Sequence, residues 1–204
     1  MKKLGAIVGL VLVLAACQGT QPAPVTQTDT PVVLPTSQSL SPASPVPPGQ
    51  CRIRGVLPDP NCTRGTLNSA VTQSTIHTTI CVSGWTKTIR PSATYTDKLK
   101  TQQIAQYGYL DITPADYEED HLVSLELGGN PTDPANLWPE PRYGSPNATN
   151  KDKVENYLKA QVCNGSMSLA DAQKGIATDW TQYLSAVSVG VQDISSDDPD
   201  DNGD

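Results

Sequence analysis

Aromatic residues and histidine are scarce in this sequence. Among 204 residues there is no Phe, aromatic residues make up 5% of the chain, and two residues are His. The hydrophobic fraction is 37%, with 18 Pro and 15 Gly, which excludes a multispan membrane protein, a coiled coil and a collagen-like repeat. A basic excess is also missing, because Cys51–Gly190 contains 12 Lys and Arg against 14 Asp and Glu. The sequence therefore lacks the extended positive surface of many nucleic-acid-binding proteins.

The N-terminal residues have the pattern of an export signal. Two lysines precede the apolar run Leu4–Ala16, which is too short to cross a hydrocarbon core of about 30 Å and is typical of a signal peptide. The residues Leu14-Ala15-Ala16-Cys17 resemble a bacterial lipobox, in which a lipid is attached to the cysteine. We therefore predict a lipoprotein signal peptide over residues 1–16, lipidation at Cys17 and export to the outer membrane or cell surface. A plain signal peptide is the alternative.

Composition divides the rest of the chain into three parts. Residues 17–50 contain eight Pro and one charged residue, Asp29, and so predict a disordered Pro/Thr/Ser-rich linker behind the membrane anchor. Residues 51–190 carry the apolar patterns of a folded domain. Residues 191–204 contain six carboxylates and predict a disordered acidic tail.

The cysteines of the folded part predict disulfides. Cys51, Cys62, Cys81 and Cys163 remain once Cys17 is lipidated, and an even number in an exported chain is typical of paired cysteines. A zinc site would need a CxxC knuckle or clustered His, and the sequence has neither. Of the three possible pairings we favour Cys51–Cys62 with Cys81–Cys163, where the long loop of the second bond stabilises the fold by about 4 kcal/mol.

Residue periodicity predicts a mixture of helices and strands. The β-branched residues of Ser74–Val82 indicate a strand, and apolar residues alternate within Tyr117–Leu127 before a Gly128-Gly129 turn. Helices are predicted over Thr96–Tyr107, with Thr96 as N-cap and Gly108 at the end, over Asn150–Val162, and after the capping residue Ser168. The inner residues of the last helix are expected to be Leu169, Ala172, Ile176 and Trp180.

The two histidines differ in their surroundings. His77 lies among threonines and is predicted to be structural or on the surface. His121 follows three carboxylates, Glu118-Glu119-Asp120. Like charges in such proximity are unfavourable unless a cation neutralises them, and carboxylate oxygen is the donor that Mg²⁺ prefers. The pattern predicts a magnesium site beside an imidazole whose ordinary pKa, about 6.5, suits proton transfer near neutral pH.

Three short elements lie in order along residues 118–153. They are Glu118-Glu119-Asp120-His121, then Asn136-Leu137, then Asn150-Lys151-Asp152-Lys153, with 15 residues from His121 to Asn136 and 14 from Asn136 to Asn150. This stretch resembles the HNH endonucleases, in the variant that has Asn in place of the last His. The resemblance implies an α+β fold: a small disulfide-supported domain containing a ββα-metal motif flanked by helices.

The resemblance also implies roles for individual residues. His121 would be the general base that activates water, Asp120 a metal ligand with Glu118 beside it, and Asn136 the residue that braces the loop between the strands. Asn150 would be the second metal ligand, with Asn147 as a competing candidate for that role. Lys153 would lie near a phosphate, and Lys151 is a second candidate for that contact.

Together these features predict a membrane-anchored endonuclease that hydrolyses DNA or RNA outside the cytoplasm. The expected cofactor is a divalent metal ion, Mg²⁺ foremost, with Mn²⁺ or Zn²⁺ as alternatives. The chemistry needs a deprotonated water and a cation to stabilise the phosphorane-like transition state. The competing interpretation is a non-catalytic envelope lipoprotein with a degenerate nuclease-like fold that acts as a binding module.

Overall fold

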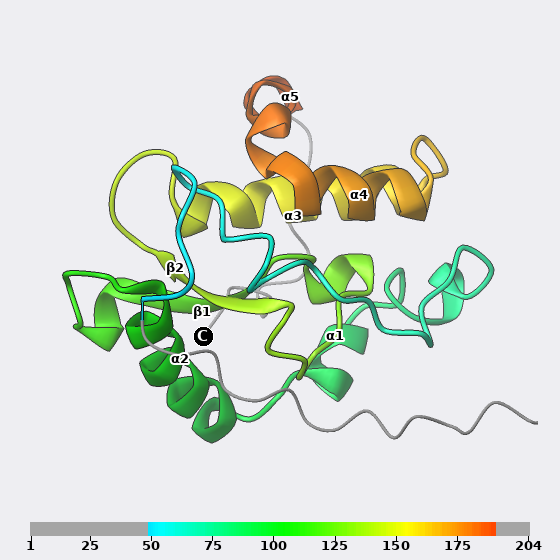
Figure 1. Ribbon diagram of the computed structural model, residues 1–204. Helices are drawn as coiled ribbons and strands as arrows, with labels where there is room; N and C mark the ends of the chain where they lie inside the picture. The colour runs from blue at the N-terminus through cyan, green and yellow to red at the C-terminus, as the bar shows by residue number, and fades with distance from the viewer. Residues whose placement is uncertain (1–48, 191–204) are drawn as a thin grey trace, which may run out of the picture. The chain divides into compact units, whose positions relative to one another are not determined.

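The computed structural model describes residues 49–190, with only the backbone at residues 189 and 190. The predicted signal peptide, Cys17, the linker up to residue 48 and the acidic tail lie outside these residues. No helix within the described part is both long enough and apolar enough to cross a membrane. Its elements are η1 (Ile76–Thr78), α1 (Trp85–Ile89), α2 (Ala93–Tyr107), η2 (Pro114–Asp116), β1 (Tyr117–His121), η3 (Leu125–Leu127), β2 (Leu137–Pro141), α3 (Ala148–Cys163), α4 (Leu169–Asp179), η4 (Trp180–Tyr183) and α5 (Leu184–Gly190), as Figure 1 shows.

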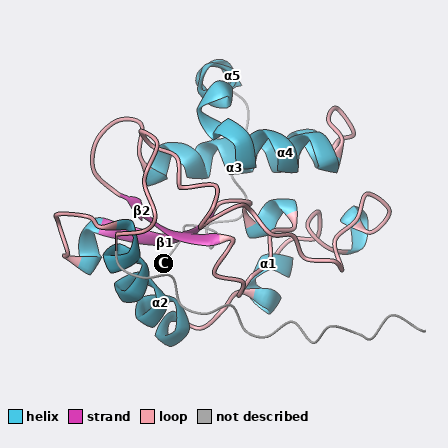
Figure 2. Ribbon diagram, viewed as in Figure 1, coloured by secondary structure: helices cyan, strands magenta, loops and turns pink. Residues whose placement is uncertain are grey.

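A two-stranded antiparallel sheet lies between helices (Figure 2). All five residues of β1 pair with all five of β2. Helix α2 lies along one side, where Gln103 Nε2 donates to the Leu137 carbonyl at 2.9 Å. Helix α3 lies on the other side, where Lys151 Nζ donates to the His121 carbonyl at 2.9 Å. The predicted α+β class is confirmed.

The main hydrophobic core lies against α3 and α4. Residues Val154, Leu158 and Val162 of α3 are buried, as their spacing on one helix face predicts. The four inner residues predicted for the α4 segment are buried as well. The Ser168 hydroxyl accepts from the Asp171 N–H at 3.1 Å, which confirms the predicted cap. Burial of each large apolar side chain stabilises the fold by about 1.5–3 kcal/mol.

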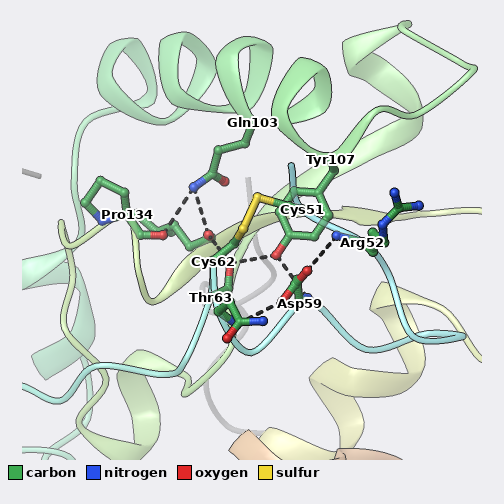
Figure 3. Close-up of a disulfide and its surroundings, with 10 residues drawn as sticks. Cys51, Arg52, Asp59, Cys62, Thr63, Gln103, Tyr107 and Pro134 are labelled. Atoms are coloured by element: carbon green, nitrogen blue, oxygen red, sulfur yellow. Dashed lines mark hydrogen bonds between the residues drawn. A yellow bond between two sulfur atoms is a disulfide. The ribbon is translucent and has the colours of Figure 1, made fainter. Parts of the chain in front are cut away.

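Both predicted disulfides are present, so the expected disulfide support of the domain is confirmed. Cys81–Cys163 joins the turns after η1 to the last residue of α3 across 82 residues of sequence. Cys51–Cys62 closes a local loop of 11 residues against the C-terminal end of α2 (Figure 3). The Cys81–Cys163 bond closes by far the longer loop. It also fixes α3, the helix on which part of the candidate site depends.

A hydrogen-bonded chain beside Cys51–Cys62 connects α2 to β2. The hydroxyls of Tyr107 and Thr63 lie 2.8 Å apart, and Thr63 Oγ1 donates to the Leu137 carbonyl at 3.2 Å. The Asp59 N–H donates to the Tyr107 oxygen at 3.3 Å (Figure 3). Burial raises the pKa of Tyr107 to about 12, although the hydrogen bonds to Thr63 and from Asp59 act in the opposite direction.

This pKa predicts a loss of stability at alkaline pH. Tyr107 contributes its full stabilisation below the unfolded-state pKa of about 10, and the contribution falls as the pH rises from about 10 to 12, by up to about 2 kcal/mol. In urea unfolding, the free energies of unfolding of the wild-type protein and of Tyr107→Phe should therefore differ by the same amount at every pH below 10. The difference should shrink above pH 10, and a difference independent of pH up to 12 would contradict the assignment.

Four sequence-based expectations about secondary structure are wrong. Ser74–Val82 forms turns and the short 3₁₀ helix η1, not a strand. The reason lies in its threonines: the Thr75 hydroxyl donates to the Ala70 carbonyl at 2.9 Å, and the Thr79 hydroxyl to the Thr75 carbonyl at 2.7 Å. Such local side-chain bonds compete with strand pairing.

The other three differences concern where elements begin and end. Helix α2 starts at Ala93, after Ser92, so Thr96 lies inside the helix; Gly108 ends the helix in the left-handed conformation (φ 63°), as predicted. The extended region after Tyr117 ends at His121, because the chain then turns into η3. Helix α3 also begins two residues before the predicted Asn150.

Candidate functional site

A small acidic cavity lies beside β1. Four consecutive residues of the strand, Glu118–His121, line it, which places it along the strand edge that does not pair with β2. Its free space of about 20 Å³ is enough for one water molecule or one ion. The remaining lining residues are Arg90, Ser124, Leu125, Glu126, Asp152 and Glu155.

His121 is buried at the end of β1 and held in one orientation. Its Nε2 lies 3.0 Å from the Pro131 carbonyl oxygen, and 6% of the residue is exposed. Burial lowers the pKa of His121 to about 4, so the ring is neutral at pH 7. Because a carbonyl oxygen can only accept, Nε2 carries the hydrogen in the neutral ring and Nδ1 keeps a lone pair. The side chain can therefore accept a proton.

Asn136 holds the loop that carries this carbonyl. Its Nδ2 donates to the carbonyls of Val123 and Asn130, both at 3.0 Å, and its Oδ1 accepts from the Val123 N–H at 2.9 Å. A Cβ at Gly129 would lie 1.7 Å from the Val123 oxygen and 2.7 Å from Asn136 Nδ2. Only glycine fits at position 129, which explains the second glycine of the Gly128-Gly129 turn.

Asp120 is bonded within the protein through both carboxylate oxygens. Oδ1 accepts from the His121 N–H at 2.7 Å, and Oδ2 accepts from Lys151 Nζ at 2.6 Å. Lys151, which is 0% exposed, also donates to Glu155. Burial favours neutral forms, but the attraction between these charges is stronger: it raises the pKa of Lys151 well above its usual range and lowers that of Asp120.

The other carboxylates of the two strands differ in their partners. Glu118 Oε2 lies 3.5 Å from Arg142 Nη2, and burial, with repulsion from Asp120 and Asp152, raises the pKa of Glu118 to about 7. Burial, with repulsion from Asp120, raises the pKa of Glu140 well above its usual range, and neither Glu140 oxygen has a hydrogen-bond partner within the described residues. Burial likewise raises the pKa of Glu119, whose two oxygens have no hydrogen-bond donor among the described residues.

The N-terminus of α3 uses its two asparagines for capping. Asn150 Oδ1 accepts from the Asn147 N–H at 3.0 Å, and Asn147 Nδ2 donates to the carbonyls of Arg142 and Gly144 at 3.1 and 3.2 Å. Neither asparagine lines the cavity. Lys153 is exposed on α3 and does not line the cavity either.

The structure thus brings together part of the predicted site. Glu118, Asp120 and His121 line one cavity, Asn136 fixes the loop beside it, and Asn150 and Lys153 lie apart from it. His77 is exposed, as expected. Sequence reasoning missed Glu155, Asp152 and Arg90 as lining residues and did not identify Lys151 as the buried counter-ion. The i, i+4 spacing of Lys151 and Glu155 on a predicted helix is the signal that indicates their ion pair.

The donors in the cavity suit a hard cation better than zinc. All the carboxylates there offer oxygen, whereas the four cysteines of the domain are in disulfides. Within residues 49–190, no three His, Cys, Asp or Glu side chains are grouped closely enough to hold a metal ion. Mg²⁺ is often held by only one or two carboxylates and keeps several waters. The unpaired Glu119 oxygens and the free space are therefore compatible with Mg²⁺ or Mn²⁺.

In comparisons with protein-family models, curated proteins and solved structures, nothing matches this chain. The resemblance to the HNH endonucleases therefore stays a prediction that depends on the residues of 118–153.

The contacts of Asn136 predict that it is needed for stability. Asn136→Ala would leave the Val123 N–H and the Val123 and Asn130 carbonyls without this partner, and we expect a loss of about 2–4 kcal/mol in the free energy of unfolding. The measurement is urea unfolding. Asn156→Ala removes one exposed amide on α3 and should change stability by less than about 0.5 kcal/mol. Equal effects of the two substitutions would argue against a special role for Asn136.

Proposed function

We propose that this chain is an exported, lipid-anchored, metal-dependent endonuclease that hydrolyses phosphodiester bonds of nucleic acid. The observation that carries the proposal is the state of His121: a neutral imidazole beside a carboxylate-lined cavity, with Nε2 bound to the Pro131 carbonyl and Nδ1 able to accept a proton. Phosphodiester hydrolysis needs such a base to take a proton from the attacking water.

The order of elements supports the same proposal. A strand ends at His121, a loop braced by Asn136 follows, and a second strand leads to helix α3. Lys151, near the start of α3, connects the helix to the end of the first strand. This order is the strand, strand and helix that the family resemblance implies, and it supports the proposal because His121 lies where Lys151 joins the helix to the strand.

The charge of the cavity supports metal dependence. Six of the ten lining residues are Asp or Glu, and one, Arg90, is permanently cationic. A phosphate would be repelled by this lining unless a cation lay between them. A divalent cation held by these carboxylates would lower the pKa of a bound water and neutralise charge on the phosphate. His121 and the carboxylates of β1 line the cavity in which this chemistry would take place, and Asn136 holds the loop beside it.

One observation favours the alternative, a non-catalytic envelope module with a nuclease-like fold. All three predicted ligands already have partners inside the protein: Asp120 binds Lys151, Glu118 is paired with Arg142, and Asn150 caps α3. If these contacts persist with substrate, the acidic cavity serves only the structure. The two functions differ in whether nucleic acid is cleaved.

The test is digestion of supercoiled plasmid DNA and of structured RNA by the purified full chain with Mg²⁺ or Mn²⁺, and with EDTA. We expect cleavage that EDTA stops and that His121→Ala lowers by at least about 100-fold, the usual contribution of a general base. His77→Ala changes the exposed histidine and should leave the rate unchanged. Undiminished cleavage by His121→Ala removes the proposed base, and no cleavage of either substrate by a folded wild-type protein favours the binding module.

The membrane anchor has its own test. In cells fed a radioactive fatty acid, the wild-type chain should be labelled and fractionate with membranes, because the lipobox-like sequence ends at Cys17. Cys17→Ser should abolish the labelling and release the protein from the membrane fraction. Equal labelling of the two proteins would refute lipidation at Cys17.

A further inference from the structure

Glu119 is a buried carboxylate on which the charge of Lys100 acts without a hydrogen bond between the two side chains. It lies in the middle of β1, is 4% exposed and lines the acidic cavity. Neither of its oxygens receives a hydrogen bond from any described residue. A buried polar group without a partner is strongly unfavourable, and such groups in folded proteins commonly mark the place of an ion or an ordered water.

A second unpaired oxygen lies in the same cavity. The hydroxyl of Ser124 is buried without a hydrogen-bond partner in the described part of the chain, and Ser124 lines the cavity together with Glu119. The two residues come from different segments, one from β1 and one from the residue before η3. The free space beside them holds one ion or one water. Two orphaned oxygen donors therefore share a cavity of the size of a single ion.

The carboxylates that sequence reasoning chose as ligands are engaged elsewhere. Asp120 receives hydrogen bonds at both oxygens, and Glu118 is paired with Arg142. Since side chains alternate along a strand, Glu119 points away from the face of Glu118 and Asp120 and shares its face with His121. Glu119 therefore combines a buried carboxyl group with unsatisfied oxygens next to the candidate base.

We propose that the acidic cavity binds one divalent cation through the Glu119 carboxylate, with the Ser124 hydroxyl as a further oxygen donor and water in the remaining positions. The cation belongs to the hard class of Mg²⁺ and Mn²⁺, because every protein donor is oxygen. This inference deepens the proposed function, since it moves the metal from Asp120 to Glu119. The competing state is a protonated Glu119 beside an ordered water.

The experiment measures Mn²⁺ binding to the purified full chain by the loss of the free-ion signal in electron paramagnetic resonance. The wild-type protein should bind one Mn²⁺ that Mg²⁺ displaces, and Glu119→Gln should weaken this binding at least about 10-fold. Glu140→Gln is the matched control, because Glu140 is also buried with two unpaired oxygens but does not line the cavity. It should bind Mn²⁺ as the wild type does. The acidic residues 193–204 give the same weak background in all three proteins.

A second readout covers folding. Mg²⁺ should raise the melting temperature of the wild type and of Glu140→Gln and leave that of Glu119→Gln unchanged, with circular dichroism reporting whether each variant is folded. If Glu119→Gln does not fold, Ser124→Ala takes its place and should weaken Mn²⁺ binding by a smaller factor. The proposal is overturned if Glu119→Gln binds Mn²⁺ as tightly as the wild type, or if Ser124→Ala does so where it takes the place of Glu119→Gln. It is also overturned if the wild-type protein binds no Mn²⁺.

The same variants and measurements distinguish a failure of the cation site from a failure of the proposed nuclease activity. Mn²⁺ binding that depends on Glu119, in a protein that cuts neither DNA nor RNA, rejects the nuclease and keeps the cation site. Metal-dependent cleavage in a protein whose Mn²⁺ binding is unchanged by Glu119→Gln keeps the nuclease and rejects the site.

Discussion

The buried ammonium of Lys151 is the interaction on which the candidate site depends. It connects α3 to the end of β1 through Asp120 and the His121 carbonyl, and it also donates to Glu155 of its own helix. Moving charges from water into a protein interior costs several kcal/mol for each ion, and a partner left alone there is more unfavourable still. The short sheet can therefore hold several buried carboxylates, because one lysine neutralises negative charge on the side of the sheet that faces α3. The position of His121 follows from that contact, since the lysine binds its backbone.

The same contact divides the carboxylates of β1 into two groups. Asp120 lies on the face that Lys151 neutralises, so a second cation would gain little there and would compete with the ammonium for the same oxygen. Glu119 and His121 lie on the opposite face, because successive side chains of a strand alternate. Neighbours in the sequence, Asp120 and His121, thus have different electrostatic surroundings. A motif of adjacent residues does not by itself say which of them meet one ligand.

The sequence predicted the parts of the fold that depend on repeating patterns. Val154, Leu158 and Val162 recur at helical spacing and are buried on α3, and the even count of cysteines predicted that all four are paired in disulfides. The strand prediction for Ser74–Val82 was wrong because β-branched residues favour a strand only when a partner strand is present. In this segment the threonine hydroxyls instead form hydrogen bonds with the local backbone. The burial of Lys151 could not be predicted either, since Lys151 and its partner Asp120 are 31 residues apart in sequence.

The loop from Leu122 to Asn136 shows how backbone geometry sets the chemistry of a side chain. The protonation state of His121 depends on burial, but its tautomer depends on the Pro131 carbonyl. That carbonyl is positioned by the residue before it, because Asn130 accepts from Asn136 Nδ2. Gly129 lets the chain pass close enough to Asn136 for this bond to form. The identity of a glycine and an amide thus decides which nitrogen of the imidazole can accept a proton. Residues without any acid–base chemistry of their own are in this way part of the candidate site.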